Sequence, residues 1–138
     1  MKKNKRFIDT KIDVKFKISA LWVAIMALYI YNDYFSLFKP GVLEDMLAGN
    51  MGLFPATQLA LFSAALLMAI PAVMIYLSLI LRARVNRILN IILSILYFIV
   101  MAFSIQGEWI YYMFMGIVEI LLTTTILWYA IKWPRSDE

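Results

Sequence analysis

The chain contains no cysteine and no histidine. Their absence excludes disulfides, thiolate metal sites, haem held through histidine and a Ser-His-acid triad. Acidic residues are also few, with nine against thirteen lysines and arginines. The side chains left for chemistry are carboxylates, amides and hydroxyls. We therefore expect that the protein is not an enzyme and that it holds no cofactor and no metal.

Polar residues of every kind are scarce, because 64% of the 138 residues are hydrophobic. A soluble domain of this size could not bury so much apolar surface inside its own core. No glycine-rich phosphate loop is present either. The expected solvent of most of the chain is therefore a lipid bilayer.

Four apolar stretches are long enough to cross a bilayer as helices, which takes about 20 residues each. We predict membrane spans at about residues 18–38, 57–81, 88–105 and 109–131. A basic cytoplasmic lead-in of residues 1–17 precedes the membrane domain of residues 18–133, and residues 134–138 form a tail. The predicted fold is an all-α, four-transmembrane-helix bundle.

Basic residues lie almost entirely on one side of these spans. Twelve of the thirteen lie in the lead-in, in the connection "RARVNR" or in the C-terminal region, whereas Lys39 alone lies in the other connections. Loops rich in lysine and arginine remain in the cytoplasm. Both termini are thus predicted to be cytoplasmic. The basic lead-in is expected to contact anionic lipid rather than nucleic acid.

Two shorter segments have local patterns of their own. Apolar and charged residues alternate in "TKIDVKFKIS", a pattern that taken alone favours a strand. The preferred interpretation is an extended or helical lead-in with its lysines at the headgroups, and a strand that docks a partner is the minor alternative. The segment "VLEDML", between Pro40 and Pro55, is expected to form a short surface helix. Pro71 in the second span is expected to kink its helix and to free carbonyl groups near residue 67.

Only two acids lie inside the predicted spans, Asp33 and Glu119. No lysine or arginine lies deep in a span to neutralise them, and an ionisable group at this depth is costly. Each must be protonated, hydrogen-bonded, hydrated or bound to a cation. Two interpretations remain open: both acids face one outward-facing pocket, or Asp33 reaches the headgroups while Glu119 bonds another helix.

Polar side chains recur at helical spacing on the spans. In the third span, the positions from Asn86 through Tyr97 to Ser104 follow steps of three and four residues, which places them on one face. Lipid would penalise these groups, so the faces should turn inward, either to bond other helices or to line a cavity. We predict a ligand or ion pocket formed by Asp33, Glu119, Asn32, Tyr97, Ser104, Tyr112 and Thr123.

The segments "SALWVAIMALYIYNDYF", "LLMAIPAVMIYLS" and "RVNRILNII", with a Pro-Gly in the first outer loop, resemble a known family. It is an uncharacterised family of small bacterial four-span membrane proteins, a domain of unknown function. The resemblance covers nearly the whole chain after the lead-in. It implies the four-span fold and a multi-pass place in the bacterial inner (cytoplasmic) membrane, and it implies no activity.

Two classes of function fit these observations. In the first, an integral membrane protein has an outward-facing polar pocket that binds or conducts a cation, proton or small molecule, alone or as a homo-oligomer. In the second, a structural or accessory membrane protein without transport activity uses its polar faces only to hold helices together or to recruit a partner. The two intramembrane acids favour the first class.

Overall fold

The structure, a computed structural model, describes residues 9–134. Its elements within that range are α1 (Val14–Ser36), α2 (Val42–Leu47), β1 (Asn50–Met51), β2 (Phe54–Pro55), α3 (Gln58–Ile80), α4 (Ala83–Ser104) and α5 (Ile110–Ile131). The helices α1, α3, α4 and α5 are long and apolar enough to cross a membrane. The predicted all-α, four-span architecture is therefore confirmed.

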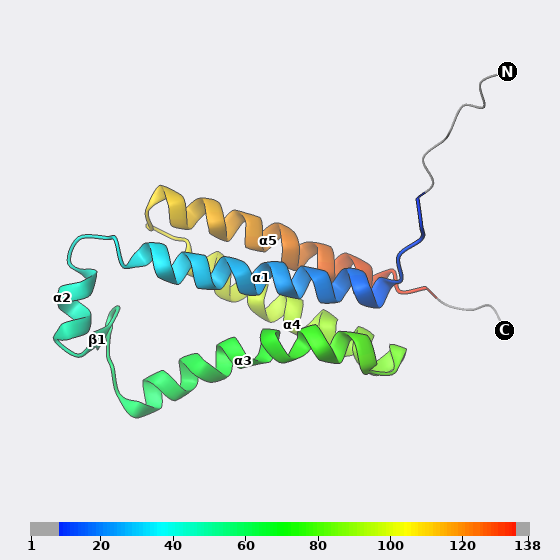
Figure 1. Ribbon diagram of the computed structural model, residues 1–138, viewed down its shortest axis with the longest axis horizontal. Helices are drawn as coiled ribbons and strands as arrows, with labels where there is room; N and C mark the ends of the chain where they lie inside the picture. The colour runs from blue at the N-terminus through cyan, green and yellow to red at the C-terminus, as the bar shows by residue number, and fades with distance from the viewer. Residues whose placement is uncertain (1–8, 135–138) are drawn as a thin grey trace, which may run out of the picture.

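The four long helices run side by side along one axis (Figure 1). α1 packs against α3 and α5, and α5 also packs along α4, whereas α3 and α4 touch only slightly. The start of α1, the end of α5 and the α3–α4 connection lie at one end of the bundle, which we call the terminal end. α2, the β1–β2 hairpin and the α4–α5 connection lie at the opposite, distal end.

α1 begins four residues before the predicted span. The Asp13 carboxylate caps the helix by accepting a hydrogen bond from the backbone N–H of Lys15 at 2.8 Å. The Lys15 ammonium then donates to the carbonyl of Leu81 at 2.7 Å, at the end of α3. The strand interpretation of the alternating segment is therefore wrong from Val14 onward, because the cap and the tertiary contact favour a helix.

α4 begins at Ala83, five residues before the predicted span, so the α3–α4 connection is very short. The side-chain amide of Asn86 donates to the carbonyl of Ser78 at 2.6 Å and closes this turn. Arg87 donates through Nε to the carbonyl of Ala130 at 3.0 Å, near the end of α5. These two side chains satisfy backbone groups that helix ends leave open, which explains why the helix extends into the basic segment.

The distal end carries the short elements. α2 spans the segment that was predicted to form a short surface helix, and none of its residues is buried. β1 and β2 form an antiparallel hairpin with Met51 opposite Phe54, which no sequence pattern predicted. Gly52 lies between the strands with a φ of 62°, a conformation that favours glycine.

The buried core is small and is centred on α1. Its fully buried members include Ile18, Trp22 and Ile25 of α1, and the ring of Trp22 meets Tyr97 of α4 edge-on at 5.9 Å between centroids. Trp22 also donates through Nε1 to Asn90 at 2.8 Å. Because lipid removes the hydrophobic drive between helices, packing and such interhelical hydrogen bonds stabilise the bundle.

Of the four long helices, α3 buries the smallest share of its residues inside the protein. Figure 1 shows that α3 bends along its length and that its distal half diverges from α1. Pro71 lies buried inside this helix, where it was expected to produce a kink. Toward the distal end of α3 the apolar side chains are open, with Leu59 74% and Phe62 65% exposed.

Candidate functional site

A cavity of about 130 Å³ lies between the four long helices in the distal half of the bundle. Its lining residues are Tyr29, Asn32, Asp33, Leu67, Met68, Tyr97, Val100, Met101, Ser104, Tyr112 and Glu119. Six of the seven residues predicted from the sequence are among them. The volume is sufficient for several water molecules. We call this space the distal cavity.

Glu119 is the deep acid of the distal cavity. It lies nine residues after the start of α5, which corresponds to a depth of about 14 Å. Its side chain is 2% exposed. Tyr29 of α1 donates its hydroxyl hydrogen to Oε1 of Glu119 at 2.6 Å. The Glu119 side chain is therefore buried between the helices, and one of its two carboxylate oxygens accepts a hydrogen bond from Tyr29.

Asp33 and Ser104 form the outer part of the distal cavity. Both are exposed, and both lie close to the distal ends of their helices, α1 and α4. Asn32, next to Asp33, is 5% exposed, and its Oδ1 atom is buried without a hydrogen-bond partner in residues 9–134. The cavity therefore leads from an exposed carboxylate, past an unpaired amide oxygen, to a buried carboxylate.

Tyr97 of α4 forms the wall of the distal cavity toward α3. Its hydroxyl donates to the carbonyl of Leu67 at 2.5 Å. Leu67 lies four residues before Pro71, and proline has no N–H to offer the carbonyl at that position. The carbonyl group expected to be free near residue 67 therefore lines the cavity and is held by the Tyr97 hydroxyl.

Thr123 is the predicted pocket residue that does not line the distal cavity. It is buried one helical turn below Glu119, and its hydroxyl donates to the carbonyls of Glu119 and Ile120, each at 3.0 Å. This bond to its own helix gives Thr123 no free donor for a ligand. Its placement in the predicted pocket is therefore corrected.

Tyr29 was not among the pocket residues predicted from the sequence, although it contacts Glu119 directly. It precedes Asp33 by four residues, so the helical period places both on the same face of α1. That spacing is the signal that identifies Tyr29 as a cavity residue.

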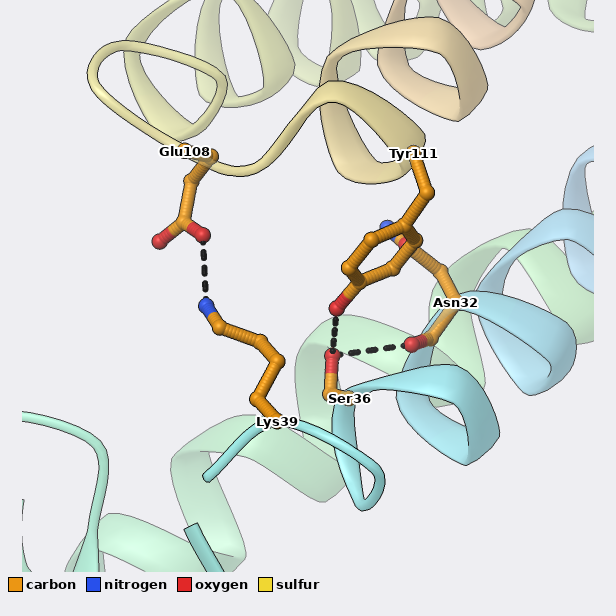
Figure 2. Close-up of polar contacts among 5 residues, drawn as sticks. All are labelled: Asn32, Ser36, Lys39, Glu108 and Tyr111. Carbon is orange, nitrogen blue, oxygen red and sulfur yellow. Dashed lines mark hydrogen bonds and ion pairs between the residues drawn. The ribbon is translucent and has the colours of Figure 1, made fainter. Parts of the chain in front are cut away.

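Among the described residues, no lysine or arginine lines the distal cavity. Within residues 9–134 the ion pair present is that of Lys39 with Glu108, at 2.8 Å between Nζ and Oε2. Figure 2 shows this pair in the distal loops, beside the Ser36 hydroxyl that donates to the carbonyl of Asn32 and lies 3.0 Å from the Tyr111 hydroxyl. The two cavity acids thus have no basic partner, so a proton, water or a cation must compensate any charge they carry.

The distal cavity ends near the middle of the bundle. Its deepest lining residues are Tyr29, Tyr97 and Glu119. Toward the terminal end follow Trp22 and Ile25, both fully buried in the core. The arrangement is therefore a one-sided pocket that does not continue between the helices to the terminal end.

Four helices that are each long and apolar enough to cross a membrane define a small multi-pass membrane protein. Residues 6–138 match the model of DUF6326, a family of unknown function, and the chain belongs to this family. The predicted membership of an uncharacterised family with four spans is thereby confirmed. No curated protein and no solved structure matches the chain.

Proposed function

We propose that this protein binds a small cation in the distal cavity, with Glu119 as the buried counter-charge and Asp33 at the entrance. The observation that carries the proposal is that both acids of the long helices line one cavity without a basic side chain. A carboxylate at membrane depth is costly unless a positive charge or a proton compensates it. A bound cation supplies that compensation.

The oxygen atoms around the distal cavity support a hard, weakly held cation. Carboxylate, amide and hydroxyl oxygens come from Glu119, Asp33, Asn32, Ser104 and Tyr112. Hard cations prefer oxygen ligands. Within residues 9–134 no group of three or more His, Cys, Asp or Glu side chains could hold a metal ion, which argues against a tight divalent site. A monovalent cation that keeps part of its water shell fits this ligand set.

The closed inner end of the distal cavity supports binding from one side rather than free conduction. The bases of the terminal end lead us to propose that this end is cytoplasmic and that the distal cavity opens to the outside of a bacterial inner membrane. In this arrangement Asp33 collects the cation, and Glu119 holds it at depth.

Thermal unfolding of the detergent-solubilised protein tests cation binding. We expect LiCl, NaCl or KCl to raise Tm relative to choline chloride at equal ionic strength, because a ligand that binds only the folded state stabilises it. Glu119→Gln should abolish the increase, and Asp33→Asn should reduce it. The increase should also fall at acidic pH, because protonation removes the carboxylate charge that attracts the cation.

The matched control for these variants is Glu44→Gln, which removes a carboxylate from the exposed helix α2 outside the cavity. This variant should retain the full increase in Tm. An equal increase for wild type and Glu119→Gln, or no increase for wild type with any of the three salts, would contradict cation binding. If Glu119→Gln does not fold, Asp33→Asn alone tests the proposal: a reduced increase in Tm supports cation binding, and an unchanged increase contradicts it.

The second candidate function is a structural or accessory role, and the Tyr29–Glu119 hydrogen bond favours it. This bond joins α1 to α5 at 2.6 Å in the interior. If this bond is the sole purpose of Glu119, Tyr29→Phe should destabilise the protein because it removes the donor. Glu119→Gln should destabilise it less, because the amide oxygen can still accept from Tyr29, and no salt should act specifically. If Glu119 binds a cation, Tyr29→Phe should retain the cation-dependent increase in Tm.

A further inference from the structure

The terminal end contains a second recess, separate from the distal cavity, with a volume of about 500 Å³. Its lining residues are Lys11, Ile12, Asp13, Val14, Lys17, Trp128, Tyr129, Lys132 and Pro134. They come from the segment that leads into α1, from the first turn of α1, and from the end of α5 with the residues that follow it. We call this space the terminal recess.

The terminal recess has an excess of positive charge. Three of its lining residues are lysines, and its single acid, Asp13, is engaged as the cap of α1. None of the three lysines forms an ion pair with a carboxylate of residues 9–134. An anionic group in the recess would therefore meet ammonium groups that no carboxylate of residues 9–134 neutralises in an ion pair.

Aromatic rings of α5 hold two of these ammonium groups. Nζ of Lys17 lies 5.3 Å from the centroid of the Tyr129 ring, and Nζ of Lys132 lies 4.4 Å from that of Trp128. Both distances lie within the range of cation–π attraction. The Lys17 contact connects α1 to α5, whereas the Lys132 contact is local to the end of α5. Both contacts keep the ammonium groups beside the recess, which distinguishes them from freely moving surface lysines.

The walls of the terminal recess combine this charge with apolar surface. Ile12, Val14 and Trp128 supply apolar area beside the lysines, and Ile12 and Trp128 are each 57% exposed. Lysine, tryptophan and tyrosine at the end of a membrane span are typical of the depth at which lipid headgroups lie. A ligand that is charged at one end and apolar at the other matches this surface.

We infer that the terminal recess binds an anionic phospholipid. The headgroup phosphate is held by Lys11, Lys17 and Lys132, and the glycerol and upper acyl chain lie against Ile12 and Trp128. A soluble phosphate would use only the lysines, so the apolar walls favour the lipid. This inference concerns the opposite end of the molecule and does not depend on cation binding in the distal cavity.

Native mass spectrometry of the detergent-solubilised protein tests the inference. Phosphatidylglycerol and phosphatidylcholine with identical acyl chains are titrated in parallel, and wild type should bind phosphatidylglycerol at least about tenfold more tightly. Each lysine near a membrane surface contributes a factor of about five in affinity. Lys17→Gln/Lys132→Gln should therefore weaken phosphatidylglycerol binding more than about tenfold and leave phosphatidylcholine unchanged.

The matched control is Arg82→Gln/Arg84→Gln. It removes two charges from exposed residues at the same end of the molecule, outside the terminal recess. This control should change the phosphatidylglycerol affinity less than about threefold. Equal losses in the two double variants would overturn the inference in favour of diffuse attraction. Equal affinity of wild type for the two lipids would also overturn it.

Two further measurements complete the test. Inorganic phosphate at millimolar concentration should not displace phosphatidylglycerol, and displacement would show a soluble-anion site and contradict the lipid assignment. If the double lysine variant does not fold, Lys11→Gln replaces it, because Lys11 precedes the cap of α1 and lies outside every helix. This single variant should lose about fivefold in affinity, and no loss would overturn the inference.

Discussion

At the scale of single residues, Pro71, Leu67 and Tyr97 form one structural unit. Proline interrupts the hydrogen-bond ladder of α3, and the carbonyl left without its usual donor is that of Leu67. The Tyr97 hydroxyl, from a different helix, supplies the missing donor at 2.5 Å. A backbone group that lipid would penalise thereby becomes part of a protein-lined cavity.

This unit predicts a coupling between two substitutions. Tyr97→Phe should lower the free energy of unfolding by about 1 kcal/mol, because it leaves the Leu67 carbonyl without a donor in the interior. In a Pro71→Ala background the same change should cost less, because the alanine N–H can bond that carbonyl. Unfolding by SDS in mixed micelles measures all four proteins of the cycle, and equal costs in both backgrounds would contradict the coupling.

At the scale of elements, Gly116 governs how closely α4 and α5 approach. It is buried on α5, and a Cβ atom added there would overlap the side chain of Ile105 and lie 2.9 Å from the sulfur of Met101. Small residues permit close helix packing in membranes, where packing replaces the hydrophobic drive between helices. Gly116 therefore sets the separation of two helices that line the distal cavity.

Gly116→Ala should destabilise the protein despite the better helix propensity of alanine. Alanine is normally favoured over glycine inside a helix by about 0.5–1 kcal/mol, whereas overpacking costs about 1–3 kcal/mol. We expect a net loss of about 1 kcal/mol in the SDS assay, and a larger loss for Gly116→Val. Thr124→Ala, at an exposed position of the same helix, serves as the control with a small effect. A more stable Gly116→Ala protein would show that Ile105 moves aside without cost.

At the scale of the whole molecule, charge is divided between the two ends. Near the terminal end, the described bases are Lys11, Lys15, Lys17, Arg82, Arg84, Arg87 and Lys132. The distal loops hold Lys39, which is already paired with Glu108, together with the exposed acids Glu44 and Asp45. This division is the basis of the proposed orientation, in which the terminal recess lies inside and the distal cavity outside.

Single cysteines introduced into the cysteine-free chain test this orientation in intact cells. A membrane-impermeant maleimide should label Ala48→Cys, after α2, and should not label Val85→Cys, at the start of α4, until the cells are opened. Both positions are exposed, so a difference in labelling reports the side of the membrane. Labelling of Val85→Cys alone in intact cells would reverse the proposed orientation.

The helical class, the number of spans and the inward face of α4 from Asn86 through Tyr97 could be predicted from the sequence, because apolar length and helical period are local properties of the chain. It also pointed to the Leu67 carbonyl through Pro71. The contact of Tyr29 with Glu119, the position of Thr123 below the distal cavity and the start of α1 at Val14 could be seen only in the folded protein. The rotation, depth and ends of each helix depend on contacts between residues that are remote in sequence. Examples are the hydrogen bonds from Lys15 to the Leu81 carbonyl and from Tyr97 to the Leu67 carbonyl, which no local pattern encodes.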